Sequence, residues 1–114
     1  MTRGTSREKV DEKGVLDDYA NYLKKAYPEL EENITSENMV GMYYKLVVGD
    51  WSPLVENQLR VWEKAFPTSL ILEALSRSLN ANHILPYAGK ILENWELAGV
   101  RTYKDVVALE GRVD

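Results

Sequence analysis

Apolar residues recur at three- and four-residue intervals along most of the chain, which is the spacing of helices with one buried face. No segment shows the alternation of apolar and polar residues that is typical of strands. The sequence therefore predicts an all-α fold, a compact bundle of five to six short helices joined by short turns. The expected helices span residues 15–27, 35–49, 52–66, 68–82, 86–99 and 102–109.

Residues typical of helix ends mark these boundaries. Pro28 disfavours helical geometry at the residue before it, and Ser52 followed by Pro53 is a preferred helix start. The other expected caps and stops are Thr35 or Ser36, Gly49, Gly99 and the capping-box pair Thr102 and Asp105.

The expected helix over residues 68–82 differs from the others because its segment 70–72 is apolar on all sides. A helix of this kind is contacted by neighbours on more than one side, so we expect it at the centre of the bundle. Its predicted inward-facing residues are Ile71, Ala74, Leu75 and Leu79.

The chain divides by composition into four predicted regions. Residues 1–14 are polar, contain two glycines and are expected to form a flexible leader. A helix and a polar connection follow over residues 15–34, and the main helical domain covers residues 35–110. Residues 111–114 are expected to fray.

Composition excludes several classes of protein. The 114 residues, 45% hydrophobic and 28% charged, suit one soluble domain with a real core. No apolar run approaches the roughly 20 residues of a membrane span, and residues 1–10 do not form a signal peptide, so a cytoplasmic location is predicted. The chain has no cysteine, one histidine (His83) and no glycine-rich phosphate loop. We therefore expect no enzymatic activity, no metal and no cofactor.

Tyr87, Ile91 and Trp95 follow one another at four-residue intervals and so lie along one stripe of a helix. Aromatic residues at this spacing are usually core. A functional role requires one edge of the stripe to stay open, because exposed aromatic rings can stack on unpaired bases.

The segment YAGKILENWELAGVRTYKDV, residues 87–106, resembles the C-terminal domain of the DnaD-type replication proteins of bacteria and their phages. That family has a Tyr-x3-Ile-x3-Trp signature followed by a glycine at the helix end. The segments NMVGMYYKLV, WSP and LILEALSRSL, which come earlier, are also similar to the family, and the resemblance covers about residues 38–108. Residues matching the signature and its continuation are Tyr87, Ile91, Trp95, Gly99 and Thr102.

The resemblance implies helicase loading and primosome assembly, with binding of DNA, single-stranded included, and contacts to initiation proteins or the replicative helicase and its loader. Self-association is left open. The residues expected to bind DNA are Tyr87, Trp95, Lys90, Arg101, Tyr103 and Lys104. Ile91 has no polar atom, so we expect it to pack and to position the two aromatic residues.

Charge favours weak DNA binding, because the chain carries a net charge of −4 and the segment after the signature is neutral by count. An alternative function is a protein-interaction module of the replication machinery that does not bind DNA. The three Trp and seven Tyr residues support this alternative, since both are enriched at interfaces.

Overall fold

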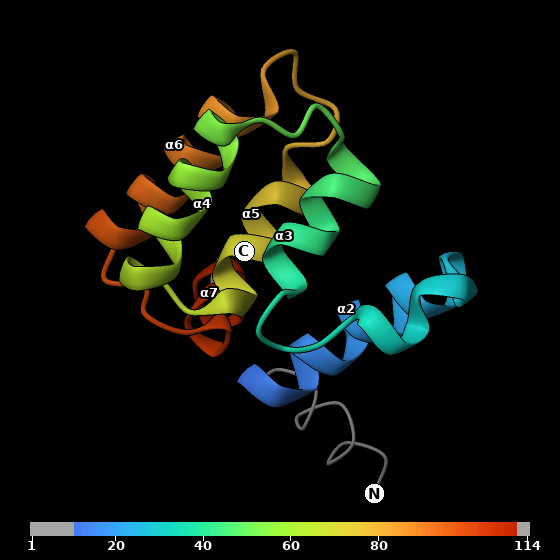
Figure 1. Ribbon diagram of the computed structural model, residues 1–114. Coiled ribbons are helices and arrows are strands. Elements are labelled where there is room, and N and C mark those ends of the chain that lie inside the picture. Colours follow the sequence, from blue (N-terminus) through green and yellow to red (C-terminus); the bar gives the residue numbers. More distant parts are fainter. Residues whose placement is uncertain (1–10, 112–114) are drawn as a thin grey trace, which may run out of the picture.

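The computed structural model describes residues 11–111, which fold into packed helices (Figure 1). No strand occurs within that range, so the predicted all-α class is confirmed. The α-helices are α2 (Glu12–Ala26), α3 (Met39–Tyr43), α4 (Pro53–Ala65), α5 (Thr68–Arg77), α6 (Ile84–Leu97) and α7 (Tyr103–Glu110). A 3-10 helix (Pro28–Asn33) follows α2, and a π-helix (Tyr44–Val48) continues α3.

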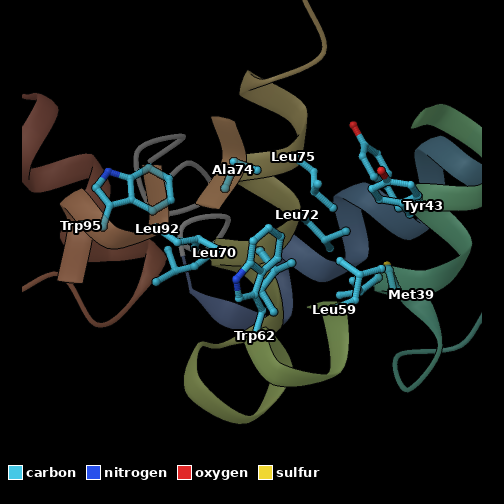
Figure 2. Close-up of a cluster of buried hydrophobic side chains, with 14 of the residues drawn as sticks. Met39, Tyr43, Leu59, Trp62, Leu70, Leu72, Ala74, Leu75, Leu92 and Trp95 are labelled. Carbon is cyan, nitrogen blue, oxygen red and sulfur yellow. The ribbon is translucent and has the colours of Figure 1, made fainter. Parts of the chain in front are cut away.

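Helix α5 lies at the centre, as its apolar segment predicts. It packs against α2, α3, α4 and α6. Figure 2 shows its side chains between Leu92 and Trp95 of α6 on one side and residues of α3 and α4 on the other. Five of its apolar side chains are fully buried: Leu70, Ile71, Leu72, Ala74 and Leu75. Each large one contributes about 1.5–3 kcal/mol of burial free energy, so this helix is the main apolar anchor of the fold.

Several predicted caps form as expected because their partners are close in sequence. The Ser52 hydroxyl accepts a hydrogen bond from the Val55 N–H at 3.2 Å, and α4 begins at Pro53. Thr102 and Asp105 form a complete capping box at the start of α7. Gly99 ends α6 with a φ of 83°, a conformation that favours glycine.

Other boundaries differ from the prediction. Helix α2 begins at Glu12 rather than at residue 15, because the Asp11 side chain caps it through the Gly14 N–H at 2.8 Å. The end of the predicted leader is therefore helical, and residues 1–10 lie outside the described range. Helix α3 begins only at Met39. The predicted cap residue Thr35 does form reciprocal hydrogen bonds with Asn38, at 2.8 and 3.3 Å, but turn residues lie between Thr35 and the first helical residue.

The end of α5 and the start of α6 also differ from the prediction. Helix α5 ends at Arg77, so Leu79 leaves the helical register and is 37% exposed rather than inward-facing. Helix α6 begins at Ile84, which places Pro86 within its first turn. Proline is tolerated there because the N–H groups of a first turn have no partner within the helix.

The start of α5 is capped from a distant part of the chain. Pro67 precedes the helix and supplies no side-chain cap. Instead, Glu12 of α2 accepts a hydrogen bond from the Ser69 N–H at 3.1 Å and another from the Ser69 hydroxyl. The carboxylate also lies where the partial positive charge of a helix N-terminus favours an anion. Helix α2 is thereby joined to the central helix by polar contacts as well as by packing.

Candidate functional site

The stripe on α6 passes from solvent into the core. Tyr87 is 52% exposed, Ile91 is partly buried and Trp95 is 6% exposed. The fully inward line of α6 is instead Ala88, Leu92 and Trp95, so Tyr87 and Ile91 lie at its margin. The stripe therefore combines a core residue with one aromatic ring that is open to solvent.

The three residues line a common surface depression. Together with Arg77 at the end of α5 and Asn94 on α6, they enclose a volume of about 320 Å³, here called the α5–α6 hollow. The exposed Lys90 lies three residues after Tyr87 on α6, which puts it on the same side of the helix. The site thus offers an exposed phenol and an adjacent ammonium group.

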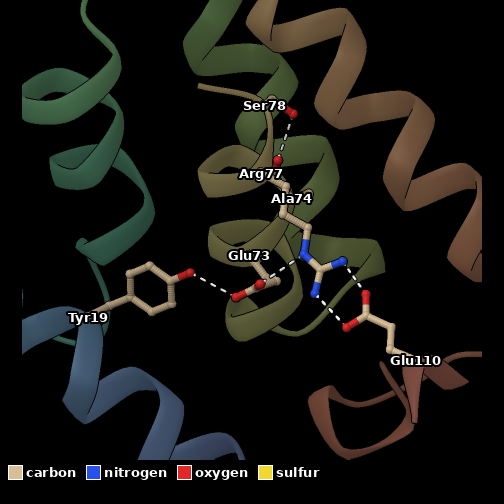
Figure 3. A network of polar contacts seen from close by, with 6 residues as sticks. All are labelled: Tyr19, Glu73, Ala74, Arg77, Ser78 and Glu110. Atoms are coloured by element: carbon tan, nitrogen blue, oxygen red, sulfur yellow. Dashed lines mark hydrogen bonds and ion pairs between the residues drawn. The ribbon is translucent and has the colours of Figure 1, made fainter. Parts of the chain in front are cut away.

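Arg77 is held in a network of polar contacts, drawn in Figure 3. Its guanidinium carbon lies 5.4 Å from the centre of the Trp95 ring, a cation–π arrangement. Its Nε donates to Glu73 at 2.9 Å, and its two terminal nitrogens donate to the two carboxylate oxygens of Glu110, one of them at 3.0 Å. These hydrogen bonds to Glu110 and Glu73 raise the pKa of Arg77, and the Arg77 contact lowers the pKa of Glu110.

Glu73 connects this network to α2. Its second oxygen accepts a hydrogen bond from the Tyr19 hydroxyl at 3.0 Å. Burial, followed by the charge of Glu73, raises the pKa of Tyr19 well above its usual value. The network therefore spans α2, α5 and α7. Arg77, which lines the hollow, is held by Glu73 of α5 and by Glu110 of α7.

The structure separates the predicted basic cluster from the α6 stripe. Lys104 lines another hollow, at the start of α5, together with Asp11, Glu12 and Glu63. Arg101 lines a third, beside Glu96. Since α5 rises by about 1.5 Å per residue, its first turn lies roughly 14 Å from Arg77.

Tyr103 does not share the surroundings of Lys104. It is half-buried, and burial followed by the charge of Glu73 raises its pKa. The charges of Arg77 and Glu110 contribute to this shift in pKa as well. Arg101, Tyr103 and Lys104 therefore do not form one continuous basic and aromatic surface, and their role in binding DNA stays a prediction.

Sequence reasoning missed Arg77. It follows Glu73 by four residues on a central helix whose buried face is largely apolar, a position where a long charged side chain must reach the surface beside the core. That exception to the apolar pattern was the available signal. Its contacts to α6 and α7, however, depend on tertiary packing and could not be read from spacing.

Neither metal coordination nor a membrane span is found in the part of the chain that the structure describes. No group of three or more histidine, aspartate or glutamate side chains between residues 11 and 111 could hold a metal ion. No helix in this range has both the length and the apolar character needed to cross a bilayer. His83 precedes α6 and is exposed, and its side chain forms no capping hydrogen bond.

Comparison with known proteins gives one match. No curated protein and no solved structure matches the chain. The model of the family described as replication initiation and membrane attachment matches residues 42–110, more than half of the 114 residues. This range contains α4 to α7 and the whole α5–α6 hollow, and the match supports the predicted resemblance to a DnaD-type domain. The chain belongs to the replication initiation and membrane attachment family.

Proposed function

We propose that this domain acts in replication initiation as a non-enzymatic accessory that binds single-stranded DNA weakly at the α5–α6 hollow and contacts initiation proteins. The observation that carries the proposal is the exposed Tyr87 ring on a hollow that lies within the family-matched region, with Lys90 about one helical turn along α6. Aromatic rings next to cationic side chains are the usual means of holding a single strand without reading its sequence.

Each residue of the stripe has a separate role in this proposal. Tyr87 stacks on an unpaired base, and Lys90 contacts a neighbouring phosphate. Ile91 and the buried Trp95 fix the position of Tyr87 by packing α6 onto the core. The small exposed area of Trp95 leaves it at most an edge contact with the strand.

The net charge of −4 limits the electrostatic part of the affinity. Binding to a single strand weakens with salt by a slope of about 0.7 per phosphate neutralised. With one or two phosphates contacted, we expect a shallow salt dependence and a modest affinity. Stacking by Tyr87 therefore supplies a large share of the binding free energy.

The test is a titration of a fluorescently labelled single-stranded oligonucleotide with the purified protein at low and moderate salt. Tyr87→Ala is expected to weaken binding by roughly 5- to 150-fold, the equivalent of about 1–3 kcal/mol of lost stacking. Tyr22→Ala is the matched control, because Tyr22 is 54% exposed but lies on α2, outside the hollow. Equal effects of the two substitutions would contradict the proposed site.

A second pair of substitutions tests the basic residues after the signature. Removing the side chains of Arg101 and Lys104 together is expected to weaken DNA binding without unfolding the domain, because both are exposed. If this double substitution leaves the affinity and its salt slope unchanged, these two residues have no part in the interface. DNA binding would then rest on the α5–α6 hollow alone.

A protein-interaction module without DNA binding is the second candidate, and the exposed apolar residues favour it. Leu54 and Val61 lie seven residues apart on one face of α4, and both are exposed, as is Leu97 of α6. Absence of oligonucleotide binding at low salt would favour this candidate. A pull-down against purified initiators and replicative helicase, with and without nuclease, then identifies the partner; contacts that survive nuclease do not require DNA.

A further inference from the structure

We infer that Arg77 is the phosphate-binding residue of the α5–α6 hollow and that Glu110 occupies it when no strand is bound. The ligand is a backbone phosphate of a single strand, and the inference rests on the proposed DNA binding at this site. Arg77 is a residue outside the Tyr-x3-Ile-x3-Trp stripe. Helix α7, which carries Glu110, acts as a gate because it blocks Arg77 until a strand binds.

The chemistry of the contact supports a competition. The Glu110 carboxylate accepts hydrogen bonds from both terminal nitrogens of Arg77. A guanidinium binds two oxygens of a phosphate in the same paired arrangement. The carboxylate therefore occupies the same donors that a phosphate would use. Arg77 lines the hollow with Tyr87, so a nucleotide whose base stacks on Tyr87 has its phosphate within reach of this guanidinium.

Arg77 remains in place if Glu110 leaves. Its Nε is held by Glu73, whose side chain is only 17% exposed, and its guanidinium rests over the Trp95 ring. The Glu110 side chain, by comparison, is 47% exposed. The contact most open to water is thus the one that has to be exchanged for a phosphate.

Helix α7 can release Arg77 without leaving the domain. Its first turn is fixed by the capping box of Thr102 and Asp105, and Val106 is fully buried. Its last turn contains the exposed Val107 and Leu109 next to Glu110. Movement of this last turn is sufficient to open the site, and by linkage a bound strand would favour the open position.

The experiment compares Glu110→Gln with Glu93→Gln in the full chain, using oligonucleotide titrations at moderate salt. Both variants lose one negative charge, but Glu93 is exposed on α6 and is not among the residues that line the hollow. Glu110→Gln is expected to bind about two- to fivefold more tightly than wild type, the range of a partly exposed ion pair. Glu93→Gln should differ little from wild type, because Arg77 is paired with Glu73 and Glu110 and not with Glu93.

Arg77→Gln and the double variant Arg77→Gln with Glu110→Gln complete a double-mutant cycle for the oligonucleotide affinity. The loss of Arg77 is expected to weaken binding and to reduce the salt slope by about one contact, and the double variant should lose the gain produced by Glu110→Gln. Hydrogen exchange gives a readout that does not depend on the variants. Amides of residues 107–110 in wild type should exchange faster when the oligonucleotide is bound.

The outcomes separate this inference from the proposed function. If wild type binds DNA and Tyr87→Ala weakens it, but Glu110→Gln behaves like Glu93→Gln, only the gate is overturned. If neither wild type nor Glu110→Gln binds at low salt, both proposals are overturned. If inorganic phosphate alone accelerates exchange in residues 107–110 as much as the oligonucleotide does, the strand is not the specific ligand of Arg77.

Discussion

Glu12→Ala tests whether the central helix depends on a cap supplied from α2. The substitution removes the acceptor of two hydrogen bonds from Ser69, a residue that is fully buried. A buried donor left without a partner costs about 1–3 kcal/mol. The loss of a negative charge near the start of α5 adds about 0.3–1 kcal/mol. Water can partly replace the carboxylate because Glu12 is at the surface, so we expect a total loss of about 2–3 kcal/mol.

The free energy of unfolding is measured by urea denaturation, followed by tryptophan fluorescence and far-UV circular dichroism. Glu12→Gln keeps one acceptor oxygen but loses the charge, so it should cost only about 1 kcal/mol. Glu93→Ala, on the exposed surface of α6, serves as the control for removing a glutamate. Combining Glu12→Ala with Ser69→Ala completes a double-mutant cycle, in which contact between the two side chains predicts a clear coupling energy.

Two results would refute this reasoning. The first is a Glu12→Ala variant whose stability lies within about 0.5 kcal/mol of the Glu93→Ala control, the range of ordinary surface substitutions. The second is strict additivity of Glu12→Ala and Ser69→Ala, which would mean that the two side chains do not stabilise each other. Either result would leave the start of α5 without a side-chain cap.

Trp95→Ala should cost about 3–5 kcal/mol and loosen or unfold the domain, because the indole is buried against Leu92 and the core; calorimetry measures the loss. The raised pKa of Tyr19 contributes stability that is fully present below its unfolded pKa near 10 and is lost as the pH rises beyond it. Above that pH the unfolded chain has released a proton that the folded chain keeps, so the loss is about 1.4 kcal/mol per pH unit, and Tyr19→Phe should show a shallower alkaline decline in urea-unfolding free energy. The lowered pKa of Glu110 contributes stability that is present above its unfolded pKa near 4.3 and is lost as the pH falls through the folded value. Because this carboxylate is largely exposed, Glu110→Gln should cost only about 0.2–1 kcal/mol at neutral pH, and the difference from wild type should disappear in acid unfolding curves.

The parts of the fold that sequence predicts are those determined by neighbouring residues. The caps at Ser52 and at Thr102 and Asp105 join groups three residues apart, so their pattern is visible in the chain. The cap of α5 joins Glu12 to a residue 57 positions away, and no local pattern indicates such a partner. Thr35 and Asn38, also three residues apart, form a further local pair, although α3 starts only at Met39.

The candidate site was predictable to the same extent. Helical spacing places Tyr87, Ile91 and Trp95 on one stripe, and the structure brings them to one hollow. Spacing does not tell which member of the stripe is open, because that depends on the angle at which α6 packs on α5. Sequence spacing also does not show that Lys104 lines a hollow with Glu12 of α2 and Glu63 of α4, and its part in DNA binding stays a prediction.

The remote cap on α5 has a consequence for where the domain can be cut. The family match begins at residue 42, inside α3, whereas the cap and the Tyr19 contact come from α2. A fragment trimmed to the matched residues would lose the first three of the five residues of α3 and expose the start of its own central helix. The stretch by which relatives are recognised is therefore shorter than the stretch that folds, and a graft of this module into a fusion protein needs to include the chain from Asp11 onward.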